Sequence, residues 1–240
     1  MNTFRILVAD DHPIFRLGLC SLIGSHKGWE VCGEAGDGRE AVEKCKQLKP
    51  DLLILDICMP NLNGVDAARQ ILYDHPVQRI LVVTDVNSEQ VVRDCLKAGV
   101  HGWVFKSDGI DDLTFAVEEL QRHKSAFSAP VSDLILDGYL RRNADPTVPE
   151  ACSLSVRQRE VLQLISEGKS NKEIATTLRL SVKTTETHRS NMMRKLNLHS
   201  IAELVLYAVR NEIVHVKLPP VLRFPSPRTK ERASLLRDVN

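Results

Sequence analysis

Five short apolar runs in the first half of this 240-residue chain most constrain its fold, because a segment with helical spacing follows each of them. The runs cover residues 4–9, 30–35, 52–55, 79–84 and 102–105. The helical segments cover residues 13–23, 39–48, 65–73, 88–99 and 110–122. Strand-like runs that alternate with helices predict a doubly wound, flavodoxin-like α/β domain with five parallel strands. The run LLIL is apolar on both faces, as expected of a central strand that helices cover.

Polar side chains stand where four of these runs end. Along the chain they are Asp10, Asp11, Asp56, Thr84 and Lys106. Because the carboxyl ends of parallel strands form the ligand-binding edge of such a sheet, we expect these side chains to converge there. The three carboxylates would repel one another unless a cation neutralised them, and an all-oxygen site suits Mg²⁺. Asp56 is then placed to attack phosphorus as a nucleophile, with Thr84 and Lys106 binding the phosphoryl oxygens.

The distribution of charge predicts a second domain with a different partner. Residues 1–128 carry 14 basic and 19 acidic side chains, whereas residues 153–217 carry 11 basic and 6 acidic ones. A basic domain is typical of proteins that bind nucleic acid. Between the two, residues 129–152 contain three prolines and predict a linker. The Pro-rich, basic residues 218–240 predict a disordered tail.

Neither a membrane segment nor a metal–thiolate site is expected. No apolar run approaches the roughly 18 residues that a membrane span needs. The N-terminus has acidic residues where a signal peptide needs an apolar stretch, and the six cysteines lack metal-binding spacing. We therefore expect a cytoplasmic protein with reduced cysteines.

The motifs VADDHP, LDICMPNLNG and GWVFK, together with the Thr that ends the fourth run, resemble the receiver domain of two-component response regulators over about residues 4–124. The resemblance implies that a histidine kinase phosphorylates Asp56. It also implies that Asp11 and the backbone carbonyl of Cys58 bind Mg²⁺ directly, together with Asp56. Asp10 would bind the ion through a water molecule.

The same resemblance assigns Thr84 and Lys106 to the phosphoryl group and makes Trp103, three residues before the lysine, the switch aromatic. Asp85 is a departure from the family, which commonly has Ala or Gly after the switch Thr. A fourth carboxylate beside the site would crowd the phosphodonor or repel the phosphoaspartate. We therefore expect Asp85→Ala to speed phosphorylation or to lengthen the lifetime of the phosphate.

The basic half carries helix signals throughout and predicts four helices, at about residues 156–166, 171–178, 182–196 and 201–211. The tetrapeptides SVRQ, SNKE and SIAE are three capping boxes, each with Ser first and Gln or Glu three residues later. The short second helix and the basic third helix have the layout of a helix-turn-helix, whose second member enters the major groove of DNA. A basic helical bundle that binds protein has the same pattern and stays as an alternative.

Residues 154–205 resemble the LuxR-type DNA-binding domain almost without gaps. On that resemblance, contacts with double-stranded DNA come from Lys183, Thr184, Glu186, Thr187, Arg189, Ser190 and Arg194. The basic side chains among them are expected at phosphates, whereas Glu186, Thr187 and Ser190 face base edges. The fourth helix resembles the family's dimerisation helix through Leu204, Val205, Ala208 and Val209. Core packing is the alternative role for those four residues.

Together these features predict a response regulator that binds DNA as a homodimer and controls transcription, with RNA polymerase as a candidate partner. Its only catalysis would be slow self-phosphorylation from small phosphodonors and self-dephosphorylation. Two other functions stay open. One is a receiver that acts as a phosphorylation-independent dimeric transcription factor. The other is a Mg²⁺-dependent phosphohydrolase, which would need a second acid to protonate the leaving group.

Overall fold

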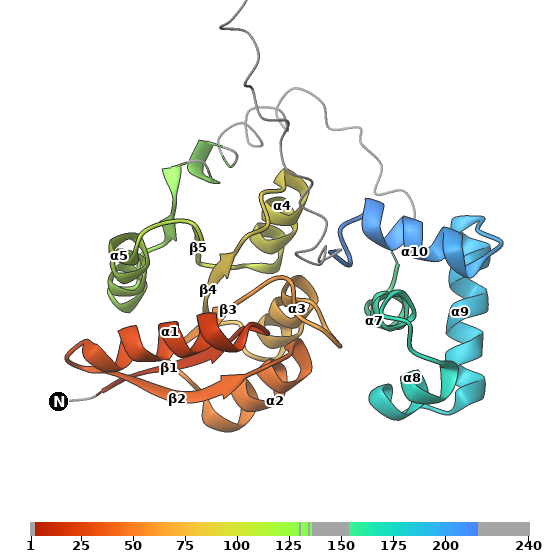
Figure 1. Ribbon diagram of the computed structural model, residues 1–240, viewed down its shortest axis with the longest axis horizontal. Coiled ribbons are helices and arrows are strands. Elements are labelled where there is room, and N and C mark those ends of the chain that lie inside the picture. The colour runs from red at the N-terminus through yellow and green to blue at the C-terminus, as the bar shows by residue number, and fades with distance from the viewer. Residues whose placement is uncertain (1–2, 130, 134, 136–153, 216–240) are drawn as a thin grey trace, which may run out of the picture.

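The computed structural model describes residues 3–129, 131–133, 135 and 154–215, which form an α/β domain followed by a helical domain (Figure 1). The α/β domain is built on one sheet with the strand order β2-β1-β3-β4-β5-β6, and every neighbouring pair is parallel. Its strands are β1 (Phe4–Ala9), β2 (Trp29–Ala35), β3 (Leu52–Leu55), β4 (Arg79–Thr84), β5 (Gly102–Phe105) and β6 (Ala126–Phe127). The predicted doubly wound fold is confirmed.

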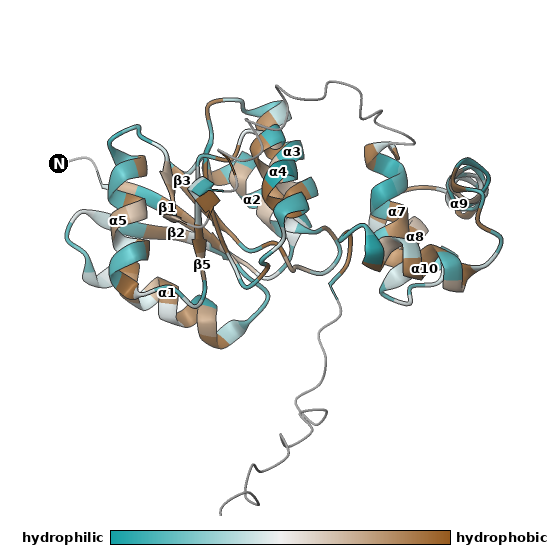
Figure 2. Ribbon diagram, turned by 90° about the horizontal axis from the view of Figure 1, so that it is seen from above, coloured by the Kyte–Doolittle hydropathy of each residue, from teal (hydrophilic) through white to brown (hydrophobic). Residues whose placement is uncertain are grey.

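Five helices cover the two faces of the sheet. They are α1 (Pro13–Ser25), α2 (Gly38–Leu48), α3 (Gly64–Asp74), α4 (Glu89–Ala98) and α5 (Ile110–Gln121). Helices α1 and α5 enclose one apolar core with the sheet, and α2, α3 and α4 enclose the other. Figure 2 shows apolar strands between helices whose outer faces are polar. Strands β1, β3 and β4 therefore bury side chains on both faces, which explains why their sequences do not alternate.

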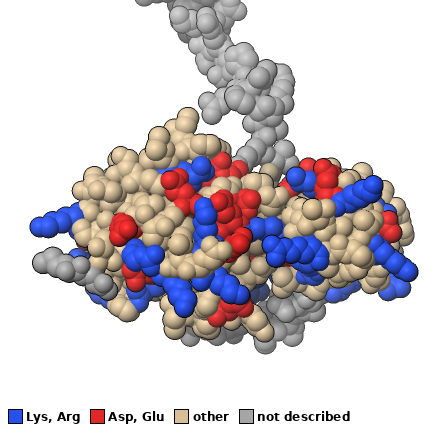
Figure 3. Space-filling model, turned by 90° about the horizontal axis from the view of Figure 1, so that it is seen from below, with Lys and Arg blue, Asp and Glu red and all other residues tan. Residues whose placement is uncertain are grey.

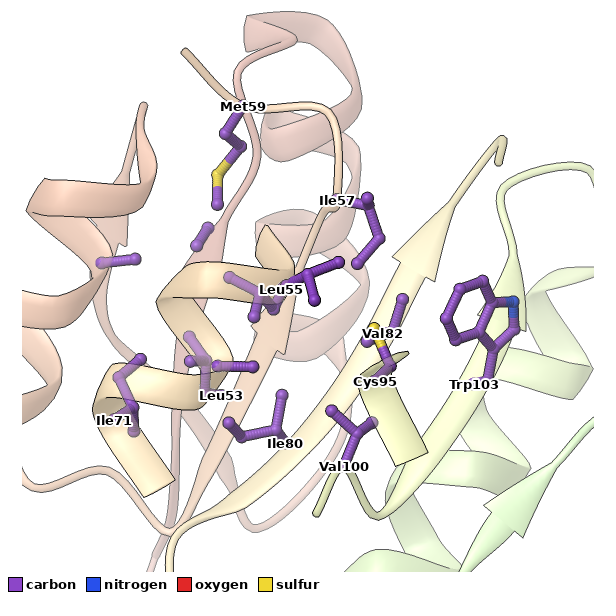
Figure 4. Packing of buried hydrophobic residues seen from close by; sticks show 14 of the residues in the cluster. Leu53, Leu55, Ile57, Met59, Ile71, Ile80, Val82, Cys95, Val100 and Trp103 are labelled. Carbon is purple, nitrogen blue, oxygen red and sulfur yellow. The ribbon is translucent and has the colours of Figure 1, made fainter. Parts of the chain in front are cut away.

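The core beneath α2, α3 and α4 extends to the carboxyl edge of the sheet. In Figure 4, Val82 of β4 lies between Leu55 of β3 and Trp103 of β5, and all three belong to this core. Ile57, just past the end of β3, is 1 % exposed and belongs to the same core. The loop after β3 is therefore anchored by apolar packing close to the residues that end the strands.

The sheet has a sixth strand where the sequence predicted five. Strand β6 has two residues and pairs with the edge of β5, and the N–H of Ala126 donates to the carbonyl of His101 at 3.1 Å. Gly102 permits this pairing, because a Cβ atom there would lie 2.8 Å from the carbonyl oxygen of Ala126. A strand of two residues has no periodic pattern of its own, which is why the sequence did not reveal it.

The helical domain consists, in its described residues, of α7 (Val156–Ser166), α8 (Asn171–Leu178), α9 (Val182–Leu196) and α10 (Ile201–Arg210). The predicted bounds differ from these by one residue at one helix end. Two of the three predicted capping boxes form, at Ser155 and Ser170. The third is incomplete, because Ser200 caps α10 while the Glu203 carboxylate accepts the N–H of His199 at 2.7 Å. Gly168, with φ of +81°, follows the end of α7 in the left-handed conformation that often ends a helix.

Two predicted segments have little or no description in the structure. The predicted linker is described only at residues 129, 131–133 and 135, and the predicted tail lies outside the described residues. Thr185 of α9 is completely buried, and its hydroxyl donates to the Ser181 carbonyl at 3.3 Å. None of the described helices combines the length and apolar character that crossing a membrane requires.

Candidate functional site

The polar residues that end the strands meet at the carboxyl edge of the sheet, as predicted. Asp10 follows β1, Asp56 follows β3, and both residues are 1 % exposed. The Lys106 ammonium, just past β5, lies 2.7 Å from a carboxylate oxygen of Asp10 and 3.2 Å from one of Asp56. The same ammonium lies 4.8 Å from the ring centroid of Phe15 on α1. One cation therefore joins two buried carboxylates from different strands.

The backbone after β3 fixes the position of Asp56. Its N–H donates to the Ala9 carbonyl at 2.9 Å, which continues the pairing of β1 and β3 by one residue. One carboxylate oxygen of Asp56 accepts the N–H of Ile57 at 2.8 Å. Gly64, at the start of α3, returns the loop so closely that a Cβ atom would lie 2.1 Å from the Asp56 carbonyl oxygen. Only glycine fits at that position, so the loop and the carboxylate are placed together.

Burial and charge set the protonation of this cluster. Burial raises the pKa of Asp10, the hydrogen bond from Lys106 lowers it, and the charge of Asp56 raises it again, which leaves the pKa above its usual value. Burial lowers the pKa of Lys106, but the attraction of Asp56 and Asp10 outweighs burial and leaves the pKa raised. Lys106 is therefore charged at neutral pH and neutralises part of the carboxylate charge.

The cluster can hold a divalent cation. Ligand atoms of Asp10, Asp11, His12 and Asp56 lie within 4.8 Å of one another. Carboxylate oxygens around a small gap suit Mg²⁺, and Lys106 alone does not balance three carboxylates. His12 was not among the predicted site residues, yet its Nδ1 lies 3.1 Å from a carboxylate oxygen of Asp11 and its backbone N–H donates to the Asp10 carboxylate at 2.7 Å. In the sequence, only its position directly after Asp10 and Asp11 indicated that His12 could belong to the site.

Thr84, Trp103 and Asp85, the other residues predicted at this edge, differ in burial and in contacts. Thr84 is completely buried and its hydroxyl accepts the N–H of Val86 at 3.3 Å. Trp103 is 1 % exposed and packs edge-on against Phe105, with ring centroids 6.1 Å apart. Asp85 has an exposed side chain and lines the pocket beside Asp56. The expected effect of Asp85 on phosphorylation stays a prediction, as does the switching role of Trp103.

A pocket of about 480 Å³ opens onto Asp56. The receiver-like domain lines it with His12, Asp56, Cys58, Asp85, Val86, Asn87, Ser88 and Lys106. The helical domain contributes Glu212 and His215, which follow α10. No local pattern indicates these two residues, because they lie more than 100 positions along the chain from the strand ends that they approach. Cys58 lines the pocket, and the role of its carbonyl stays a prediction.

Helix α9 presents a polar face to solvent. Lys183, Glu186, Thr187, Ser190 and Arg194 are exposed, whereas Thr184 and Arg189 are half-buried. The exposed residues recur every three or four positions and therefore share one face of the helix. In Figure 3, Lys and Arg side chains project from the part of the surface formed by the helical domain. The hydroxyl of Ser181 caps the helix by accepting the N–H of Thr184 at 3.0 Å. All seven predicted DNA contacts lie on this one helix.

The four residues predicted for dimerisation divide into two pairs. Leu204 and Ala208 are completely buried in the core of the helical domain with Val161, Leu164 and Met192. In this structure their side chains have no exposed surface, and dimerisation through this helix stays a prediction. Core packing, the alternative, is their observed role. Val205 and Val209 are half-buried and line a second pocket between the two domains, so they face the first domain here.

Comparisons with known proteins match both domains. Residues 6–118 match the family model described as "Response regulator receiver domain", and residues 152–208 match "Bacterial regulatory proteins, luxR family". The response regulator protein VraR of Staphylococcus aureus is 32 % identical over 212 residues, which are 88 % of this chain and 99 % of VraR.

Solved structures agree with these matches. A LuxR-family two-component response regulator from Aurantimonas sp. SI85-9A1 is 31 % identical with a TM-score of 0.55, covering 58 % of this chain and 99 % of that one. Two structures of the response regulator RcsB are 28 % identical with TM-scores of 0.53, covering 86 % of this chain and 98 % of theirs. One shows two RcsB dimers bound to two parallel DNAs, and the other shows RcsB from Salmonella enterica serovar Typhimurium bound to promoter rprA with the phosphomimetic BeF3-.

Proposed function

Because the chain belongs to the LuxR-family two-component response regulators, with a receiver domain and a LuxR-type DNA-binding domain, we propose that a histidine kinase phosphorylates Asp56 and thereby controls DNA binding. The observation that carries the proposal is the setting of Asp56. Its buried carboxylate lies 3.2 Å from the Lys106 ammonium and lines a pocket of about 480 Å³. The contact with Lys106 orients the carboxylate for attack on phosphorus, and the pocket gives a phosphodonor access to it.

The chemistry is a phosphoryl transfer to a carboxylate. An oxygen of Asp56 attacks phosphorus, the bond from phosphorus to the histidine nitrogen of the kinase breaks, and an acyl phosphate forms while the imidazole takes up a proton. Lys106 and the Thr84 hydroxyl donate hydrogen bonds to the phosphoryl oxygens. The carboxylates of Asp10, Asp11 and Asp56 would hold Mg²⁺, which supplies positive charge to the transferred group. Asp10 keeps the Lys106 ammonium oriented at 2.7 Å.

Phosphorylation by acetyl phosphate in the presence of Mg²⁺ tests this proposal. Wild-type protein should acquire one acid-labile, hydroxylamine-sensitive phosphate, and Asp56→Asn should acquire none. Asp74→Asn, which replaces an exposed carboxylate at the end of α3, is the matched control and should be labelled like the wild type. Full labelling of Asp56→Asn would refute the assignment of Asp56. Chelation of divalent ions should abolish labelling, since the carboxylates then repel the incoming phosphoryl group.

The same assay separates the alternatives. A phosphohydrolase would turn over the phosphodonor many times per protein molecule, whereas a phosphorylation-independent transcription factor would acquire no phosphate. We expect one phosphate per chain, with self-phosphorylation from small donors and self-dephosphorylation both slow. Asp85 is exposed and lines the same pocket, so Asp85→Ala in this assay also tests whether its charge slows phosphorylation.

The second half of the proposal concerns DNA. The relatives support binding of double-stranded DNA by a homodimer, since the RcsB structures are described as dimers bound to DNA and as a complex with a promoter. The polar face of α9 is exposed and can enter a major groove. The partial positive charge at the N-terminus of this helix favours contact with DNA phosphates. RNA polymerase would be the downstream partner, and the cytoplasm the location. Footprinting should reveal two half-sites spaced about one helical turn apart.

A further inference from the structure

The DNA-binding domain is joined to the loop that follows Asp56 by buried hydrogen bonds. The side chain of Gln163 on α7 is at their centre, and the residue is 2 % exposed. Its amide nitrogen donates to the Met59 carbonyl at 3.1 Å, and its amide oxygen accepts the N–H of Asn63 at 2.8 Å. Glu167, one turn later, accepts the N–H of Asn61 at 3.0 Å. These contacts fix α7 to the segment between β3 and α3.

Ion pairs also join α7 of the DNA-binding domain to α2 and α3 of the receiver domain. Arg159 of α7 lies 3.0 Å from Asp66 of α3, and Arg39 of α2 lies 3.5 Å from Glu160 of α7. Asp66 is 3 % exposed and Glu160 is 4 % exposed. Gln70 also donates to Glu160, at 2.8 Å. Asp66 and Glu160 also pair with Arg69 and Arg157 of their own helices, so the pairs across the contact add to the stability of the docked position.

The segment after α10 places two side chains at the phosphoacceptor pocket. The Glu212 carboxylate accepts a hydrogen bond from the Ser88 hydroxyl, on the loop between β4 and α4. The carbonyl of Ile213 accepts the side-chain N–H of Asn63 at 3.3 Å. Glu212 and His215 line the pocket that also contains Asp56 and Lys106. Part of the pocket wall therefore comes from the other domain.

Glu212 also has an unfavourable backbone conformation. Its φ is +56°, in the left-handed region where glycine is the unstrained residue after a helix. The conformation is held by the Glu212 N–H, which donates to the Val209 carbonyl at 3.1 Å. A charged residue in this position directs its carboxylate to Ser88 at the pocket, which glycine cannot do.

The described contacts leave the DNA-reading helix uncovered. Among the described residues, the hydrogen bonds and ion pairs between the domains involve α7 and the segment after α10, and none involves α9. Lys183, Glu186 and Ser190 of α9 are exposed in the docked position. Docking therefore restricts the approach to Asp56 and leaves the face of α9 open.

We propose that Glu212 and His215 form the outer wall of the phosphoacceptor pocket, and that Glu212 selects against strongly anionic phosphodonors while the domains are docked. This inference rests on the proposed phosphorylation of Asp56. A carboxylate at the pocket repels an incoming phosphoryl dianion, so small donors react slowly with the docked protein. Once Asp56 carries the phosphate, the same repulsion weakens the contact between Glu212 and Ser88 and favours separation of the domains.

The test compares two small phosphodonors on the full chain with Mg²⁺. Acetyl phosphate is a dianion at neutral pH and phosphoramidate is a monoanion, so they differ in their repulsion by Glu212. Glu212→Gln keeps the size of the side chain and removes its charge. It should raise the rate of labelling by acetyl phosphate by about three- to tenfold, and that by phosphoramidate by a smaller factor. Equal rates for wild type and variant with acetyl phosphate, or an equal rise with both donors, would overturn the proposal.

Two further variants complete the experiment. Glu203→Gln removes an exposed carboxylate from the first turn of α10, away from the pocket, and keeps an acceptor for the N–H of His199. It should label at the wild-type rate, and acceleration equal to that of Glu212→Gln would overturn the local role of Glu212. Gln163→Ala should loosen docking and accelerate both donors, and an unchanged rate would contradict restriction by docking. If the wild type shows no Asp56-dependent label with either donor, the proposed function itself fails.

Discussion

Replacement of Lys106 by Met should show how much the Lys106 ammonium stabilises the receiver domain by pairing with the buried carboxylates. The Lys106 ammonium lies 2.7 Å from Asp10 and 3.2 Å from Asp56, and its side chain is 7 % exposed. Because both acids are 1 % exposed, water does not replace the lost cation. Removing one partner of a buried ion pair typically costs about 3–5 kcal/mol, and the apolar Met side chain offsets about 1 kcal/mol of that.

We therefore expect Lys106→Met to lower the free energy of unfolding by about 3 kcal/mol when no divalent ion is present, which corresponds to a fall in Tm of about 10 °C for a domain of this size. Both tryptophans, Trp29 and Trp103, lie in the receiver domain, so Trp fluorescence reports its unfolding separately from that of the DNA-binding domain. Lys46→Met, at an exposed position in the last turn of α2, is the control. Equal melting temperatures for the two variants at pH 8 would refute the reasoning.

The pH dependence provides a second check on the same variant. Burial raises the pKa of Asp10 above its unfolded value, and the hydrogen bond from Lys106 opposes that rise. A group with a raised pKa in the folded state favours folding at low pH, and this contribution is lost as the pH rises through the folded pKa. Without Lys106 the pKa of Asp10 should rise further. The stability deficit should therefore be smaller at pH 5 than at pH 8, and a larger deficit at pH 5 would contradict this account.

Three other predictions follow from the structure. Gly64→Ala would place a Cβ atom 2.1 Å from the Asp56 carbonyl oxygen, so the loop must shift, and labelling by acetyl phosphate should slow by about a hundredfold. Leu204→Ala should cost about 2–5 kcal/mol of stability in the DNA-binding domain, measured by circular dichroism, because the side chain is completely buried. Arg189→Ala should weaken binding to all DNA sequences and lower the salt slope by about one counterion, whereas Glu186→Ala should relax preference at one base pair by roughly 1–3 kcal/mol. An Arg189→Ala variant with altered sequence preference and an unchanged salt slope would mean that the helix is oriented differently in the groove.

Local patterns in the sequence predicted the receiver edge because four of the strands are followed abruptly by a polar residue or end in one. Asp10, Asp56 and Lys106 follow buried apolar runs, and the parallel topology brings such positions together without further information. The helix ends of the DNA-binding domain were predictable for a similar reason, since Ser residues at N-caps are local signals. Strand β6 was missed because its pairing depends on the edge of β5 and on no pattern of its own.

Contacts between the domains were beyond what the sequence could indicate. Gln163 and Glu160 look like ordinary polar positions of an amphipathic helix, and their burial arises only when the receiver packs against α7. The role of Leu204 and Ala208 was open for a similar reason, because their apolar character fits a dimer surface and a core equally well and only the fold places them in a core. A helical pattern shows that a face is buried, but the partner that buries it depends on tertiary structure.

The polar character of the contact between the domains has a calorimetric consequence. Hydrogen bonds and ion pairs such as Gln163 with Asn63 and Arg159 with Asp66 join the domains. Hydration of apolar surface raises the heat capacity, whereas hydration of polar surface lowers it. Separation at this contact should therefore change the heat capacity less than exposure of an equal, wholly apolar area would, since its polar part opposes the contribution of the apolar side chains beside it. A smaller heat-capacity change makes the enthalpy of separation less dependent on temperature, so the balance between docked and separated domains should vary more smoothly with temperature than at a wholly apolar contact.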